Sequence, residues 1–160
     1  MADPTERERF VERMAGALTD AGLPRLPSRV FAALLVDDDG RMTAAELADA
    51  LGVSPAGISG AVNYLSRVGM LRRERERGSR RDVYVVDDDA WHEAMMREDQ
   101  AYRPMLAALD SAVESVGDTD PAYRRLRVTR EFLRFVSEEM RGISSRWEER
   151  RRALERELDG

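Results

Sequence analysis

The chain has 160 residues, of which 36% are charged and only 6% are aromatic; this predicts one helix-rich domain, or a small domain with added helices. It has no cysteine and a single histidine, His92, so disulfides and thiolate metal sites are excluded and a histidine base has one candidate position. Neither a membrane-spanning run nor a secretory signal is recognisable, so we expect a cytoplasmic protein with no membrane partner.

The net charge of −5 argues against a nucleic-acid binder, but the charges are segregated along the chain. Residues 54–86 contain seven arginines and three acidic residues, whereas residues 87–120 contain two arginines and ten acidic residues. Because the local field matters more for phosphate contact than the total charge, the first of these segments remains a candidate nucleic-acid surface.

Two helices are expected at the start of the chain. Apolar residues recur at helical spacing over residues 5–21, and Thr5, with a glutamate three residues later, is expected to cap this helix. A second helix is expected to open at Pro27 and to end at the acidic run 37–39. Consecutive acids without a later glutamate do not match a calcium-binding loop, so the run is predicted to be a solvated turn and no metal site is expected.

Residues 43–69 predict two short helices joined by a tight turn. Thr43, with a glutamate three residues later, is expected to cap the first helix, and Gly52 to end it in a left-handed conformation. Ser54 is expected to cap the second helix, and Gly69 to end it. The predicted buried stripe of the second helix is Ile58, Val62, Leu65 and Val68.

The opposite face of this second helix is small and polar, where long charged side chains are usual. Such a face suits a recognition helix, whose first turns must approach base edges in the major groove. Its glycines at 57 and 60 each cost about 1 kcal/mol in helix propensity, which close approach to DNA would explain; tight packing against another helix is the alternative. The residues expected to contact DNA are Ser54, Pro55, Ala56, Ser59, Gly60, Asn63, Tyr64 and Arg67.

Residues 70–86 change to an alternating pattern with a Gly-Ser turn, which predicts an exposed β-hairpin. A helix, a turn, a helix and a basic hairpin together predict a winged helix-turn-helix; two ordinary packed helices are the alternative. The wing is expected to cross the DNA backbone and reach the minor groove, unless it is only a solvated hairpin. Asp82 is expected to hold a neighbouring arginine, and the wing residues expected to contact DNA are Arg77, Ser79, Arg80 and Arg81.

Two long helices are expected after the hairpin, one opened by the aspartates at 87–89 and one over residues 121–158. In the last helix, apolar residues recur every seven positions, and such a seam must pack against a partner helix within the chain or across a dimer. The predicted seam is Leu126, Leu133, Met140, Trp147 and Leu154.

The segment TAAELADALGVSPAGISGAVNYLSRVGMLRRERERGSRRDVYVV resembles the DNA-binding domain of MarR-type regulators, most of all the actinobacterial GbsR-like group. The resemblance covers residues 22–95 well and the terminal helices only in general layout. The expected fold is mainly α with a small β-hairpin: a winged helix-turn-helix at 23–90, with helical dimerisation regions at 1–22 and 91–160. The absence of cysteine makes the thiol-sensing members poor models.

The resemblance further implies a homodimer that represses or activates from a pseudo-palindromic operator of double-stranded DNA, often released by a small effector. Aromatic and methionine side chains of the later helices are candidates to line an effector pocket, although they could equally be core. These candidate pocket residues are Trp91, Met95, Tyr102, Phe132 and Phe135.

Two other function classes are the alternatives to a DNA-binding regulator. A winged helix can serve as a protein-interaction module without specific DNA binding. An enzyme lacks support, because no nucleophile–histidine–acid set, phosphate-binding glycine loop or metal cluster is recognisable. Glu98 and Asp99, near His92, are interpreted as a solvated face. We therefore expect a sequence-specific transcriptional regulator, in the first instance a repressor, with no catalytic residues and no cofactor.

Overall fold

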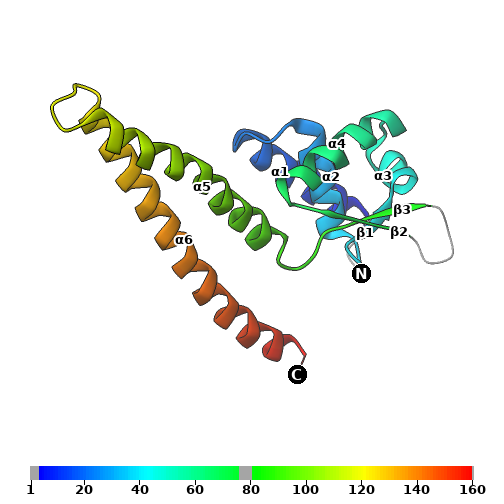
Figure 1. The fold of residues 1–160 in the computed structure, drawn as a ribbon. Coiled ribbons are helices and arrows are strands. Elements are labelled where there is room, and N and C mark those ends of the chain that lie inside the picture. The colour runs from blue at the N-terminus through cyan, green and yellow to red at the C-terminus, as the bar shows by residue number, and fades with distance from the viewer. Residues whose placement is uncertain (1–3, 76–80, 160) are drawn as a thin grey trace. The chain divides into compact units, whose positions relative to one another are not determined.

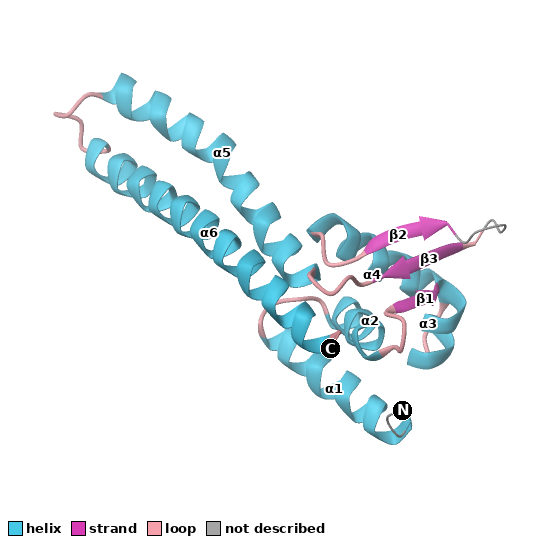
Figure 2. Cartoon of the chain, turned by 90° about the horizontal axis from the view of Figure 1, so that it is seen from below, coloured by secondary structure: helices cyan, strands magenta, loops and turns pink. Residues whose placement is uncertain are grey.

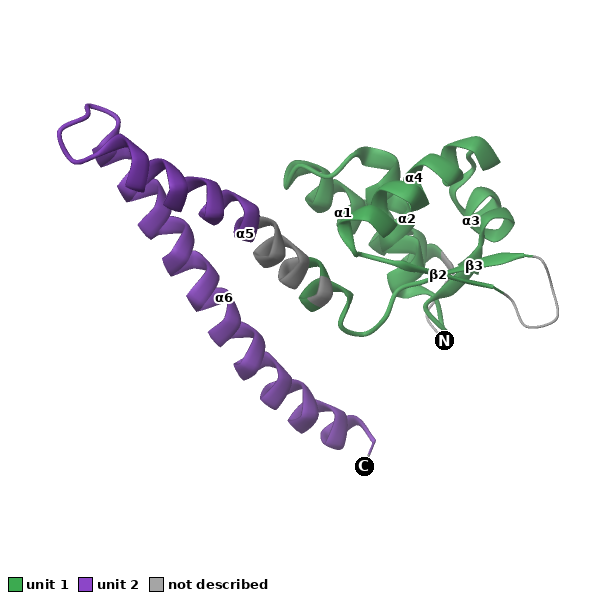
Figure 3. Ribbon diagram, viewed as in Figure 1, with its two compact units in different colours: residues 1–94 green, residues 95–160 purple. Residues whose placement is uncertain are grey.

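The computed structural model describes residues 4–75 and 81–159, with only the backbone described for residues 4, 93 and 95–101. The chain divides into two compact units, residues 1–94 and 95–160 (Figure 3). In chain order the elements are α1 (Pro4–Asp20), α2 (Arg25–Val36), β1 (Arg41–Thr43), α3 (Ala44–Leu51), α4 (Pro55–Val68), β2 (Arg72–Arg75), β3 (Asp82–Val85), α5 (Ala90–Val116) and α6 (Tyr123–Leu158) (Figure 1).

The core of the first unit lies among α2, α3 and α4, with α1 packed along α2. Its largest fully buried side chains include Phe31 and Leu34 from α2, Leu47 from α3, and Ile58 and Leu65 from α4. Burial of each such side chain contributes about 1.5–3 kcal/mol to folding. These contacts bury one face of α4 and thereby determine which of its residues, on the opposite face, stay accessible.

The caps predicted for α3 and α4 are confirmed. The Glu46 amide donates to Thr43 Oγ1 at 3.3 Å, while Glu46 Oε2 accepts from the Thr43 amide at 2.7 Å, which makes a complete capping box. Gly52 takes the left-handed conformation, with φ 64°, between the two helices. Ser54 Oγ then accepts from the Gly57 amide at 3.3 Å.

Three expectations about element boundaries were wrong. The first helix begins at Pro4, so Thr5 lies inside its first turn and not at its cap. The second begins at Arg25 and contains Pro27 in its first turn, where proline needs no amide donor. The last begins at Tyr123, two residues later than predicted.

The sheet has three antiparallel strands in the order β1-β3-β2, so the prediction of a two-stranded hairpin was incomplete (Figure 2). The additional strand β1 pairs through Arg41 with Val85 and through Thr43 with Val83. It follows the acidic turn, in which Asp37 Oδ2 accepts from the amides of Asp39 at 3.2 Å and Arg41 at 3.1 Å. The acidic run therefore acts as a turn, and it leads the chain into the sheet.

In the second unit, the Asp110 carboxylate of α5 lies 2.7 Å from Arg134 and 3.7 Å from Arg130 of α6. The predicted seam is half-buried at Leu126, Leu133, Met140 and Trp147, whereas Leu154 is exposed. More exposed than this seam are Val128, Phe132 and Phe135, which are 62%, 62% and 60% accessible. In the part of the chain that the structure describes, no helix combines the length and apolar character needed to span a bilayer.

The capping box gives the fold a predictable acid sensitivity. Hydrogen bonds from the amide and hydroxyl of Thr43 hold the pKa of Glu46 below its ordinary value of 4.5. Because the folded-state pKa is the lower one, this contribution to stability is present above pH 4.5 and is lost as the pH falls through the folded-state pKa. We expect Glu46→Gln to lower the thermal midpoint at pH 7 and to lose this deficit progressively as the pH falls below 4.5.

Thermal unfolding followed by circular dichroism across this pH range tests the prediction. The matched control is Glu139→Gln, which removes an exposed carboxylate in the middle of α6, far from either helix end. A Glu46→Gln deficit that stays constant with pH would contradict the role assigned to the carboxylate.

Candidate nucleic-acid interface

The structure places all eight predicted recognition-helix residues on the accessible side of α4. Ile58, Ala61, Val62 and Leu65 point into the core and are at most 3% accessible. On the opposite side, Tyr64 is half-buried and the other seven are exposed: Ser54, Pro55, Ala56, Ser59, Gly60, Asn63 and Arg67. The accessible face is therefore built of small and polar groups, with one aromatic ring and one cation at its C-terminal end.

The two glycines of α4 differ in their surroundings. A Cβ at Gly57 would lie 3.2 Å from Leu26 Cδ2, so Gly57 lets the start of α2 approach α4. At Gly60, by contrast, no heavy atom of the described residues lies within 4 Å of such a Cβ apart from its chain neighbours and the local backbone of α4 itself. Helix packing therefore explains Gly57, whereas Gly60 opens onto the accessible face.

Tyr64 and Arg67 form a contact at the C-terminal end of this face. The guanidinium carbon of Arg67 lies 6.0 Å from the centroid of the Tyr64 ring, within the range of a cation–π interaction. Arg67 is also the basic residue in the last turn of α4, where the helix dipole favours a positive charge. Both effects keep one positive charge at this edge of the α4 face.

The wing consists of β2 and β3, and the tip that joins them, residues 76–80, lies outside the described residues. Three of the predicted contacts, Arg77, Ser79 and Arg80, fall in that segment. Arg81 is described and exposed. The pKa of Glu46 is lowered chiefly by its hydrogen bonds with Thr43, and the positive charge of Arg81, next to the wing tip, lowers it slightly further.

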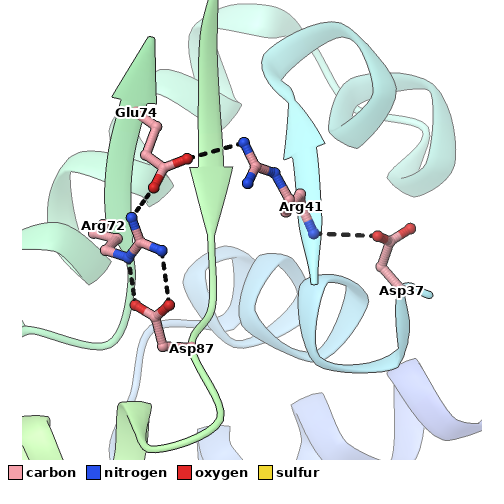
Figure 4. A network of polar contacts seen from close by, with 5 residues as sticks. All are labelled: Asp37, Arg41, Arg72, Glu74 and Asp87. Atoms are coloured by element: carbon pink, nitrogen blue, oxygen red, sulfur yellow. Dashed lines mark hydrogen bonds and ion pairs between the residues drawn. The ribbon is translucent and has the colours of Figure 1, made fainter. Parts of the chain in front are cut away.

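Two arginines of the basic segment are held by acidic residues of the same chain. Arg73 pairs with Asp82, which confirms the expectation that Asp82 holds a neighbouring arginine. Arg72 donates to Asp87 through both Nε and Nη2, the latter at 2.8 Å from Oδ1 (Figure 4). The hydrogen bonds from Arg72 lower the pKa of Asp87. Sequence reasoning missed this pair, because its residues are fifteen apart.

A cavity of about 590 Å³ lies within the first unit, between α1, α2, β1 and α3. Val11, Ala33 and Leu51 line it with apolar groups. Arg29 also lines it, paired with Glu12 Oε1 at 2.8 Å and hydrogen-bonded to the Leu51 carbonyl oxygen at 3.3 Å. This cavity is built from other residues than the effector pocket predicted from the sequence.

The residues of the predicted effector pocket differ in their packing and exposure. Trp91 packs edge-on against Phe31, with ring centroids 5.3 Å apart, which gives it a core contact. Tyr102 is half-buried, while Phe132 and Phe135 are exposed on α6. The side chain of Met95 lies outside the described residues. The pocket itself therefore stays a prediction.

The comparisons with known proteins agree with this fold. Residues 21–82 match a family model described as MarR family, and residues 89–150 match one described as MmpR5-like MarR family transcriptional regulator. The HTH-type transcriptional regulator MmpR5 of Mycobacterium tuberculosis is 31% identical over 150 residues, which cover 93% of this chain and 90% of that protein. A crystal structure of a transcriptional regulator is 29% identical, with a TM-score of 0.78, over 90% of this chain and 99% of that chain.

A winged helix-turn-helix in which one face of the second helix is accessible is an architecture of DNA-binding regulators. The chain belongs to the MarR family of transcriptional regulators, which are DNA-binding proteins and not enzymes. The finer expectation of a GbsR-like member is not confirmed, because the matching model of the C-terminal region is MmpR5-like.

The contrast between the two glycines gives a direct test of the accessible face. Gly60→Leu places a side chain in open space and raises helix propensity by up to about 1 kcal/mol, so the thermal midpoint should stay the same or rise. DNA affinity should nevertheless fall at least tenfold, because the side chain would hold the backbone away from the groove. Gly57→Leu is the matched comparison and should lower the midpoint by clashing with Leu26.

Thermal melting together with fluorescence anisotropy on duplex DNA measures both effects. If Gly60→Leu unfolds the protein, Gly60 packs against another element. If it melts and binds as the wild type does, this face of α4 does not meet DNA.

Proposed function

We propose that this chain acts as a homodimer that recognises a pseudo-palindromic operator by sequence, represses transcription while bound, and is released by a small effector. In this proposal the accessible face of α4 reads base edges, and the arginines of the wing contact the backbone and the minor groove. Two copies related by a twofold axis would place two such faces in successive major grooves, about 34 Å apart.

The accessible face of α4 is the observation that carries the proposal. Ser59 and Asn63 are one turn apart on it and are exposed, so their polar groups are available to base edges. Gly60 between them leaves room for the helix backbone to approach. A solvated helix face needs neither feature, because long charged side chains give better helix propensity and solubility.

Asn63 is proposed to specify sequence. An asparagine side chain can make two hydrogen bonds to adenine, worth about 1–3 kcal/mol of discrimination. We expect Asn63→Ala to lower affinity for the operator about tenfold or more, with affinity for scrambled DNA and the thermal midpoint nearly unchanged. Equal losses on both duplexes would contradict a role in specificity.

The wing is proposed to contribute affinity without specificity. Replacing both Arg80 and Arg81 with alanine should weaken binding to operator and scrambled duplexes alike, and should reduce the slope of log affinity against log salt by about two. Unchanged affinity and slope would show that the wing does not touch DNA. A wild-type protein with almost no salt dependence would favour a protein-interaction module instead.

The dimer is proposed to form through α6. Val128, Phe132 and Phe135 lie on the side of α6 opposite the half-buried seam, because an α-helix turns 100° per residue. These large apolar side chains are at least 60% accessible within one chain, and exposed apolar patches of this kind mark protein interfaces. We expect Phe132→Glu combined with Phe135→Glu to convert a dimer into a monomer in sedimentation experiments, with helix content retained. A variant that still sediments as a stable dimer would contradict this interface, and Ser145→Glu, which adds a negative charge at an exposed position on another side of α6, is the control for changed surface charge.

The effector is proposed to act on the first unit or on the helices that follow it. A molecule entering the cavity between α1 and α3 would contact Ala50 and Leu51, directly before the Gly52 turn. Genome-wide mapping of bound DNA would identify the regulated genes, and their products would indicate which molecules to test for release from the operator. Transcription from a bound promoter that rises when the protein is added would contradict repression.

A further inference from the structure

A chain of polar contacts crosses one face of the wing sheet (Figure 4). Arg72 donates two hydrogen bonds to the Asp87 carboxylate and also forms an ion pair with Glu74. Glu74 Oε2 in turn lies 2.9 Å from Arg41 Nη2, and the Arg41 amide donates to Asp37 Oδ2 at 3.1 Å. These five residues join the end of α2, the strands β1 and β2, and the connection from β3 to α5.

The strand register shows what this network covers. Arg41 and Arg72 are both paired with Val85, and Glu74 is paired with Val83. Directly paired residues point to the same face of a sheet, so the charged side chains lie on the same face as the two valines. Val83 and Val85 are only 8% and 5% accessible. Tyr84 points to the other face of the sheet, where it joins the helical core. The aliphatic stems of Arg41, Arg72 and Glu74 thus help to cover Val83 and Val85 on the face away from that core.

Asp87 lies between the end of β3 and the start of α5, and its carbonyl oxygen accepts from the Ala90 amide at 3.0 Å. Arg72 is the first residue of β2, which lies at the edge of the sheet and pairs with β3. An arginine that donates two hydrogen bonds to one carboxylate has little freedom of orientation. The pair therefore holds the base of the wing, where β2 begins, against the segment that leads into α5.

We propose that Arg72 and Asp87 are positioning residues for DNA binding: together they fix the start of β2, and with it the wing, to the segment that leads into α5, and Arg72 is not itself a DNA contact. This inference rests on the proposed contact between the wing and DNA. It separates the arginines of the basic segment into two groups, those that hold the wing in place and those near its tip that meet phosphates.

The substitution Asp87→Asn tests the proposal through the sign of its effect. Removing a negative charge near DNA should by itself strengthen binding. If Asp87 positions the wing, its loss should instead weaken binding about fivefold, on a duplex selected by this protein from a random-sequence pool. Asp88→Asn is the matched control, because Asp88 is the exposed neighbouring residue and should show no loss. Asp87→Asn binding as tightly as Asp88→Asn, or more tightly, would overturn the proposal.

Two further measurements separate positioning from a general loss of structure. In a protein that already carries Arg80→Ala and Arg81→Ala, Asp87→Asn should no longer weaken binding, because the wing then has little left to position and only the loss of a negative charge is felt. An equal loss in both backgrounds would overturn the proposal. Arg72→Lys keeps the charge but not the paired hydrogen bonds, so it should also weaken binding about threefold; unchanged affinity would overturn the proposal even if Asp87→Asn folds poorly.

The same experiment separates this inference from the proposed function. If the Arg80→Ala and Arg81→Ala protein binds DNA as the wild type does, the wing contact itself is wrong and the positioning role fails with it. If that protein binds weakly while Asp87→Asn binds normally, the wing contact stands and only the role of the Arg72–Asp87 pair is wrong.

Discussion

The packing of Ile58, Val62 and Leu65 against the rest of the first unit is the constraint on which the proposed DNA-binding surface depends. An α-helix turns 100° per residue, so burial of this stripe leaves Ser59, Gly60 and Asn63 facing outward. A polar substitution in the stripe would leave an unsatisfied group in the core and destabilise α4 before it changed any DNA contact. Stability and recognition are therefore assigned to opposite faces of one helix of fourteen residues.

The acidic character of the whole chain is compatible with DNA binding because its charges are arranged unevenly. Asp82 and Asp87 neutralise Arg73 and Arg72 within the sheet, so acidic residues beside the wing shape it and do not simply oppose DNA. The local excess of arginine counted along the sequence thus overstates the charge available to phosphates. In the proposed function, that charge comes from the arginines at 77, 80 and 81, together with Arg67 on α4.

Features decided by neighbouring residues were predictable from the sequence. The cap at Thr43 and the turn at Gly52 depend on residues a few positions apart, and the accessible face of α4 follows from helical periodicity. The strand β1 was missed because three residues cannot show an alternation, and its pairing with β3 links segments about forty positions apart. The role of Gly57 depends on Leu26, and that of Arg72 on Asp87; such pairs form only in the folded chain. The roles of the site residues in contacting DNA remain proposals.

Photocrosslinking tests the central claim most directly. The full-length protein would be bound to its selected duplex carrying 5-iodouracil at successive positions, irradiated, and mapped by mass spectrometry. An aromatic side chain at a DNA surface is a good acceptor, so Tyr64 should crosslink within each half-site, and residues of the wing should crosslink at its flanks. Crosslinks confined to α5 and α6, with none on α4 or the wing, would contradict the account.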